Sequence, residues 1–131
     1  MRTQPRLGTP GYAQGYAPPP INWIDRGRVY KVGQNTCVPV GCYQDVLVIE
    51  EFEHNKPGAF QLKYYAPCVG DVRVGWRGPE EEEKEGLELV KDVRLSPQAQ
   101  AEARAGALKL EMHAYEIKNF YRKTQPAKPT L

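Results

Sequence analysis

Residues 36–74 read TCVPVGCYQDVLVIEEFEHNKPGAFQLKYYAPCVGDVRV, and this stretch decides the fold class. Around its first long strand, Leu47 and Ile49 fall on one face of an extended chain, and Val46 and Val48 fall on the other. A strand that is apolar on both faces is typical of a central strand covered from both sides. Pro39 with Gly41 supplies the turn residues before this strand. The stretch therefore predicts two successive β-hairpins.

Strand-like patterns continue on both sides of the stretch. They begin near Trp23 and recur at residues 60–65, 72–76 and 87–95, with Pro- and Gly-containing turns at intervals of about 8–12 residues. The acidic run at 79–85 (PEEEEKE) is predicted to be a solvated loop between the last two strands. We expect an α+β fold in which an antiparallel, twisted meander of about five strands precedes one long C-terminal helix.

The helix is predicted to begin at Ser96 and to end near Lys123. Ser96 is a favourable N-cap and Pro97 suits the first helical position. At 100° per residue the helix carries two apolar stripes on nearly opposite sides. The first stripe is Ala101, Ala105, Leu108, Met112 and Tyr115, and the second is Ala103, Ala107, Leu110, Ala114, Ile117 and Tyr121. One stripe is expected to pack on the chain's own sheet, and the second, through Leu110, Ile117 and Tyr121, is expected to contact a partner.

The chain of 131 residues is expected to hold one domain with flanking segments. Residues 1–21 form a Pro-, Gly- and Tyr-rich arm, 22–95 the sheet, 96–123 the two-faced helix and 124–131 a flexible tail. The arm is either a disordered leader or an extended segment whose Tyr12 and Tyr16 dock on a neighbouring subunit.

The three cysteines allow three interpretations. If Val38–Gly41 form the hairpin loop, Cys37 and Cys42 face each other across the first pair of the ladder and can form a disulfide. Free thiols are the second possibility. In the third, Cys37, Cys42, Cys68 and His54 bind zinc, although their spacing is looser than that of common zinc motifs. A disulfide would indicate an oxidising compartment, and Cys68 would then remain as a buried thiol or as an intermolecular one.

Bulk composition disfavours several functions. The net charge of +2 gives no global field that would attract nucleic acid. The longest apolar run, Val46–Ile49, is too short to span a membrane, and the first twelve residues have no apolar core of a signal peptide. No cofactor motif is present in the sequence.

Two groups of side chains are candidates for a small-molecule site. Tyr43, Tyr64, Tyr65 and Trp76 could line a cleft between helix and sheet. Glu51, Glu53 and His54 could support hydrolytic acid–base chemistry, but such a cluster is also typical of a solvated strand end.

The segments NTCVPVGCYQDVLVIEEF and FQLKYYAPCVGDVRV resemble the C-terminal half of a group of uncharacterised bacterial secreted or lipoprotein-like β-sheet proteins. The match covers roughly residues 28–95, and Cys68 stands where that group has a turn glycine. The resemblance implies an antiparallel sheet and an extracytoplasmic origin, and it implies no activity. This chain lacks the N-terminal half of the group's sheet, so its own sheet is expected to have an open edge.

From these patterns we expect a non-catalytic structural or interaction subunit. It would self-associate or bind a protein partner through the helix, the arm and the open sheet edge. The alternatives are a binding module for an apolar or aromatic small molecule and, less favoured, the hydrolase.

Overall fold

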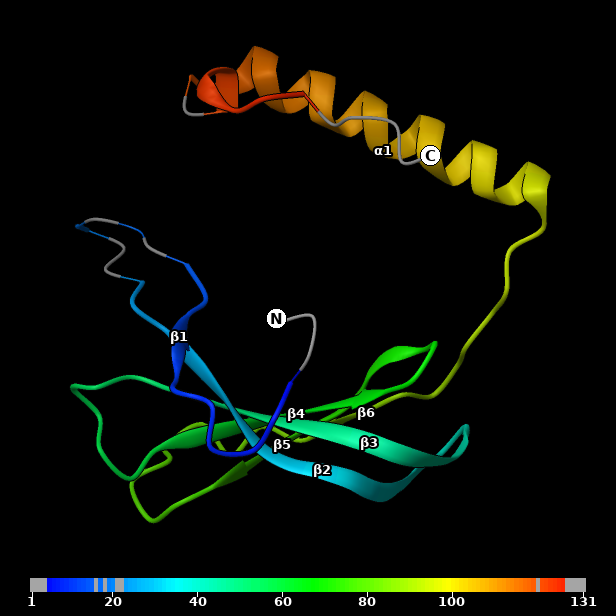
Figure 1. The fold of residues 1–131 in the computed structure, drawn as a ribbon. Coiled ribbons are helices and arrows are strands. Elements are labelled where there is room, and N and C mark those ends of the chain that lie inside the picture. Colours follow the sequence, from blue (N-terminus) through cyan, green and yellow to red (C-terminus); the bar gives the residue numbers. More distant parts are fainter. Residues whose placement is uncertain (1–4, 16, 18, 21–22, 120, 127–131) are drawn as a thin grey trace. The chain divides into compact units, whose positions relative to one another are not determined.

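The computed structural model describes residues 5–15, 17, 19–20, 23–119 and 121–126. The chain divides into two compact units, residues 1–92 and 93–131, and each is described by itself. The first unit is a sheet and the second is a helical segment (Figure 1). This is the α+β class that the sequence predicts.

The sheet is an antiparallel meander of six strands, one more than expected, in the order β1-β2-β3-β4-β5-β6. Its strands are β1 (Tyr12–Ala13), β2 (Arg26–Val38), β3 (Gly41–Phe52), β4 (Phe60–Ala66), β5 (Gly70–Arg77) and β6 (Leu87–Glu88). Each strand pairs with the next along the chain, because turns that contain Pro or Gly connect β2 to β3, β3 to β4 and β4 to β5.

The core lies on the central strands. Val46, Val48 and Ile49 of β3 are almost completely buried, as the two-sided apolar pattern of that strand predicts. Val46 packs with Ala66 and Val72, and the partly buried rings of Tyr43 and Tyr64 surround them; Leu89 packs on the same cluster.

The first hairpin is tighter than expected. Val38 and Gly41 are themselves a cross-strand pair, so Pro39 and Val40 alone form the turn. Cys37 and Cys42 are the next pair along the ladder, and they form a disulfide with an S–S distance of 2.09 Å. The pairing is confirmed, and the loop prediction was two residues too long.

The last strand is much shorter than the predicted span 87–95. Only Leu87 and Glu88 pair with β5, after which Leu89 donates a backbone hydrogen bond to Val72 and accepts one from Val40. The in-phase apolar residues of the predicted strand are Leu87, Leu89, Val93 and Leu95. Only Leu89 packs on the core cluster, while the side chains of the other three are exposed. The alternation of apolar residues alone therefore predicted too long a strand.

The helix α1 spans Pro97–Ile117 and ends six residues before the predicted Lys123. Ser96 caps it as expected, since its Oγ accepts a hydrogen bond of 3.2 Å from the backbone N–H of Ala99. After the C-cap Lys118, a 3₁₀ turn, η1, covers Tyr121–Lys123. Within the described part of the chain, no helix has the length and apolar character needed to cross a membrane.

Part of the N-terminal arm joins the sheet. β1 pairs with Arg26 and Gly27 of β2, and the ring of Tyr12 lies directly over Gly27. A Cβ at Gly27 would lie 2.9 Å from Gln14 Nε2 and 3.1 Å from the Tyr12 ring, so a larger residue there would displace these two side chains. Tyr12 therefore packs on its own chain, and Tyr16 lies outside the described residues.

Candidate functional site

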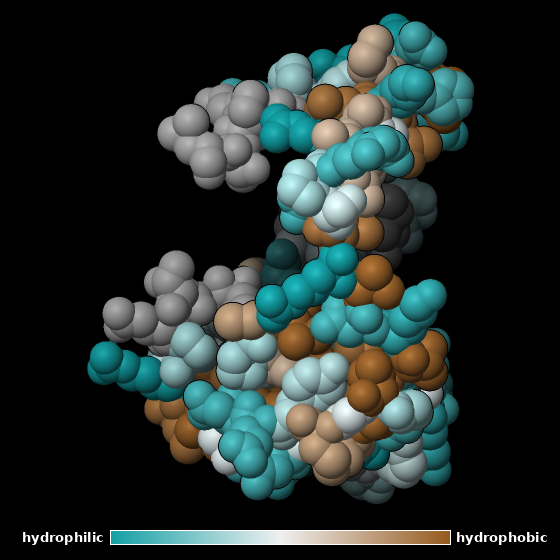
Figure 2. All heavy atoms as spheres, turned by 90° about the vertical axis from the view of Figure 1, so that its right-hand side faces the viewer, coloured by the Kyte–Doolittle hydropathy of each residue, from teal (hydrophilic) through white to brown (hydrophobic). Residues whose placement is uncertain are grey.

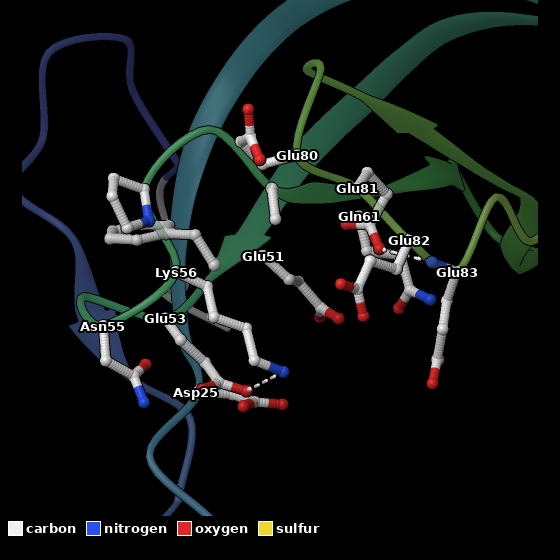
Figure 3. Close-up of a pocket in the computed structure, with 13 residues that line it drawn as sticks. Asp25, Glu51, Glu53, Asn55, Lys56, Gln61, Glu80, Glu81, Glu82 and Glu83 are labelled. Atoms are coloured by element: carbon white, nitrogen blue, oxygen red, sulfur yellow. Dashed lines mark hydrogen bonds and ion pairs between the residues drawn. The ribbon is translucent and has the colours of Figure 1, made fainter.

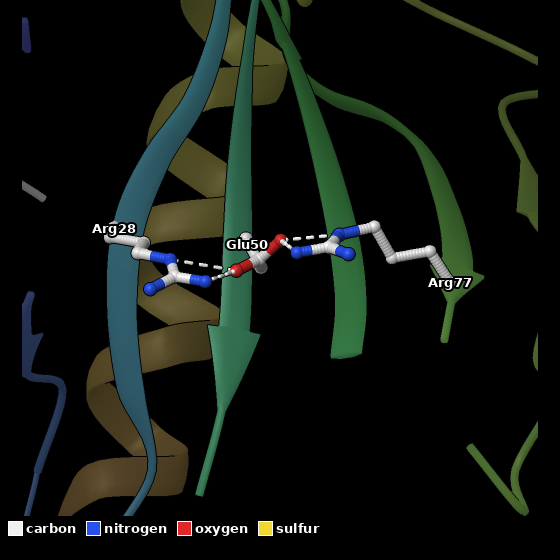
Figure 4. Close-up of polar contacts among 3 residues, drawn as sticks. All are labelled: Arg28, Glu50 and Arg77. Carbon is white, nitrogen blue, oxygen red and sulfur yellow. Dashed lines mark hydrogen bonds and ion pairs between the residues drawn. The ribbon is translucent and has the colours of Figure 1, made fainter. Parts of the chain in front are cut away.

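The most organised polar cluster in the described residues surrounds Glu50 on β3. Its side chain is fully buried and lies between Arg28 of β2 and Arg77 of β5. Arg28 Nε donates to Glu50 Oε1 at 2.7 Å, and Arg77 Nε donates to Oε2 at 2.5 Å. A second nitrogen of each guanidinium also pairs with the same oxygen (Figure 4). We call these three residues the Glu50 clamp.

Aromatic rings support both guanidinium groups of the Glu50 clamp. Arg28 lies 4.8 Å from the ring centre of Phe52, and Arg77 lies 4.0 Å from that of Phe60. Arg77 also faces the ring of Tyr30 at 4.8 Å. Such contacts add to the stability of a cation that has left bulk water.

The chemistry of the Glu50 clamp is that of a structural ion pair network. Both carboxylate oxygens already accept hydrogen bonds from arginine, so Glu50 offers no free acceptor to a substrate. Arg77 reaches Glu50 across the intervening strand β4, and the clamp thereby ties β2, β3 and β5 together. The Glu50 clamp has a net charge of +1, and the side chains of Arg28 and Arg77 are 44% and 34% exposed.

A second polar region is an open hollow of about 840 Å³ beside the ends of β3 and β4 (Figure 3). Its lining carries the carboxylates of Asp25, Glu51, Glu53 and Glu80–Glu83, with one amine from Lys56. Lys56 lies 3.8 Å from Glu53. Among the described residues, no three His, Cys, Asp or Glu side chains converge as a metal site would require.

Of the predicted acid–base group, Glu51 and Glu53 both line this hollow, whereas His54 is not among its lining residues. Glu51 accepts a 2.6 Å hydrogen bond from Gln14 of the arm, and Glu53 pairs with Lys56. His54 is exposed at the end of β3, where its ring meets the edge of Phe52 at 5.6 Å. Glu50 points to the face opposite Glu51, as alternation predicts.

Two groups on the sheet have raised pKa values. Burial is the largest cause of the raised pKa of Tyr65, and the carboxylates of Asp71 and Glu51 add to it. Burial also raises the pKa of Asp71, and the positive charge of Lys63 opposes this only partly. Tyr65 and Asp71 are cross-strand partners, so the carboxylate of Asp71 disfavours a negative charge on Tyr65.

The four candidate cleft aromatics do not share one site within the sheet. Tyr64 and Trp76 line an open hollow of about 590 Å³ along β5, together with Val74 and Val90. Tyr65 follows Tyr64 directly, so it points to the other face. Tyr43 packs on the core cluster. A cleft between helix and sheet stays a prediction.

The cysteines separate into a bonded pair and one free thiol. The disulfide of Cys37 and Cys42 removes two of the four predicted zinc ligands, so the zinc interpretation is wrong. Cys68 is free and exposed in the turn between β4 and β5, with a φ of 62°. A buried thiol, one of the two expectations for it, is therefore excluded.

The surface of α1 is the other feature that needs an explanation. None of its residues is buried by the helical unit itself, and packing of one stripe on the chain's own sheet stays a prediction. Leu110, Met112 and Ile117 are 72%, 63% and 58% exposed. Figure 2 shows apolar side chains between hydrophilic ones at the surface of the helical unit. Within its own unit, neither stripe of the helix is therefore covered.

Comparison with known proteins adds no assignment, because no family model, curated protein or solved structure matches this chain.

Sequence reasoning did not find the Glu50 clamp. Arg28, Glu50 and Arg77 are separated by 22 and 27 residues, and only the register of the sheet brings them together. One signal was available: Glu50 continues the face of Val46 and Val48, which a central strand buries. A charge at such a position calls for a partner of opposite sign.

Proposed function

We propose that this protein is a non-catalytic interaction subunit that assembles through its C-terminal helix, with contributions from its N-terminal arm and an open sheet edge. The observation that carries the proposal is the surface of α1. A helix of 21 residues has no buried residue, while three of its large apolar side chains are more than half exposed.

The energetics of isolated helices support this proposal. Helices of such length are only marginally stable in water, and most helical stability in proteins comes from packing an apolar face. Contiguous exposed apolar surface on a folded protein is characteristic of interaction sites. A partner that covers α1 would supply the burial that the helical unit itself does not provide.

The sheet edge is a weaker contact surface than the helix. Only Arg26 and Gly27 of the 13-residue strand β2 pair with β1, so most of its outer edge is open. However, the pairing of β2 with β3 has three register irregularities between Val29 and Thr36. Bulges twist an edge and hinder the addition of another strand. We therefore place the main contact on α1.

Light scattering coupled to size exclusion tests the proposal on the full chain. The wild type is expected to show a mass above the 14.8 kDa of one chain, rising with concentration. A variant in which Leu108, Leu110, Met112 and Ile117 are all replaced by glutamine, so that both apolar stripes are changed, is expected to stay at the mass of one chain, because glutamine keeps helix propensity and removes apolar area.

The matched control replaces apolar residues that are exposed elsewhere. Val69→Gln with Val90→Gln changes two exposed side chains of the sheet unit and should leave the mass of the wild type unaltered. A wild-type protein that keeps the mass of a single chain up to its solubility limit would exclude self-assembly as its function.

A small-molecule binding module is the second candidate. The hollow along β5 favours it, since Tyr64, Val74, Trp76 and Val90 offer apolar and aromatic surface there. In a thermal-shift screen with aromatic ligands, this candidate requires a stabilising ligand whose effect Trp76→Ala abolishes. Stabilisation that persists in Trp76→Ala would place the ligand elsewhere.

A further inference from the structure

We propose that α1 pairs with α1 of a second copy of this chain, antiparallel and along its full length, through the stripe Ala101, Ala105, Leu108, Met112 and Tyr115. This inference rests on the proposed assembly through α1, and it adds the occupant, the direction and the register. The stripe is spaced alternately by four and three residues, which is the repeat of a helix–helix seam.

The charges beside this stripe carry the argument. One flank reads Glu102, Lys109, Glu116, so its sign alternates every seven residues. The other flank reads Arg104, Glu111, Lys118, with the opposite signs in the same order.

Seven residues along a helix are about 10.5 Å apart, which is too far for an ion pair within one helix. Inside α1, Glu102 accepts a hydrogen bond from Gln98, Glu111 accepts one of 3.1 Å from the hydroxyl of Tyr115, and Glu116 lies 3.7 Å from His113. These contacts join residues three or four positions apart and not residues at heptad spacing. Charges that alternate at heptad spacing on both flanks are suited to contacts between two helices.

The alternation selects the antiparallel direction. With the two-fold axis between Gly106 and Ala107, Glu102 lies beside Lys109 of the second copy, and Arg104 lies beside Glu111 of the second copy. Each of these attractive contacts occurs twice. This register is also the one in which the helices overlap almost completely, because the axis lies at the middle of Pro97–Ile117.

Side-chain sizes fit the same register. Ala105 faces Leu108 of the second copy, and Ala101 faces Met112 of the second copy, so each small residue receives a large one. Antiparallel packing also brings the positive N-terminal end of each helix next to the negative C-terminal end of the other.

A parallel pair through the same stripe is disfavoured. In a parallel seam, each residue of the flank that contains Arg104 faces the residue five positions further on in the partner's other flank. Arg104 would then face Lys109 and Glu111 would face Glu116, which are like-charged contacts. The other apolar stripe, which contains Leu110 and Ile117, has charges of alternating sign on only one of its flanks. Its other flank carries Gly106 and His113. Its Leu110 and Ile117 remain outside the proposed seam.

Charge reversal on the full chain tests the pairing, with dimerisation measured by sedimentation. Glu102→Lys alone and Lys109→Glu alone each turn two attractive contacts into repulsive ones, and each should weaken self-association about tenfold. When the two variants are mixed, every such contact becomes attractive again, so the mixture should form heterodimers as tightly as the wild type. Circular dichroism of each variant checks that α1 remains helical.

Distances between spin labels check the direction independently. With Cys68→Ser as background and a label at Gln98→Cys, the antiparallel pair separates the labels by about 26 Å along the axis, whereas a parallel pair brings them side by side. Tighter self-association of Lys109→Glu, or adjacent labels, would overturn the antiparallel register and leave the proposed assembly intact. A wild type that never associates would overturn both.

Discussion

At the scale of single residues, the Glu50 clamp shows how a polar side chain is placed inside a small sheet. Taking a carboxylate out of water costs several kcal/mol unless opposite charges and hydrogen bonds compensate for it. Arg28 and Arg77 provide both, and their half-exposed side chains keep part of their own hydration. The clamp therefore stabilises the fold as a unit, and the loss of one member affects the others.

Glu50→Gln tests the contribution of the clamp. The amide keeps the size of the side chain but removes the charge that both arginines face, so we expect a loss of about 3 kcal/mol in the free energy of unfolding. Urea denaturation measures it. Glu53→Gln is the control, since its surface ion pair with Lys56 should contribute less than about 1 kcal/mol. Equal effects of the two substitutions would contradict the account.

Cys68 gives a second prediction at this scale. Its φ of 62° is in the left-handed region, which costs a residue with a Cβ about 1 kcal/mol in conformational free energy. Cys68→Gly should therefore raise the free energy of unfolding by up to this amount, while Cys68→Ser should leave it unchanged. A destabilised glycine variant, measured by the same denaturation, would mean that the thiol makes a contact that outweighs the backbone cost.

At the scale of elements, the predictable parts are those with local causes. The hairpin containing Cys37 and Cys42, the two-sided strand β3 and the capped start of α1 all follow from turn residues, alternation and a serine at the right place. The predicted end of α1 and the predicted length of β6 were wrong, because α1 ends at Ile117 and only Leu87 and Glu88 pair with β5. The clamp was missed because the register between distant strands is not a local property.

The disulfide gives the prediction for the hairpin. It closes a short loop, with a sequence separation of 5 between the cysteines. Loop-closure entropy for such a ring is about 2 kcal/mol. Cys37→Ser with Cys42→Ser should lower the free energy of unfolding by this amount and reduce the melting temperature by roughly 10 °C in calorimetry. If adding reductant to the wild type does not reproduce this loss, the disulfide does not stabilise the fold in solution.

At the scale of the whole molecule, the two units differ in how they are stabilised. The sheet has a buried core, a disulfide and the Glu50 clamp, whereas α1 has a good N-cap and no buried side chain. The sequence predicts a two-faced helix, and the helical unit itself covers neither face. Assembly through α1 would cover them.

Amide hydrogen exchange of the wild-type chain at low and high protein concentration tests this claim most directly. Helix amides that are covered by a partner exchange slowly, whereas those of a marginal, isolated helix exchange fast. We predict that protection of α1 rises with concentration while that of β3 and β4 stays constant. Exchange of α1 amides at one fast rate across all concentrations would contradict the account.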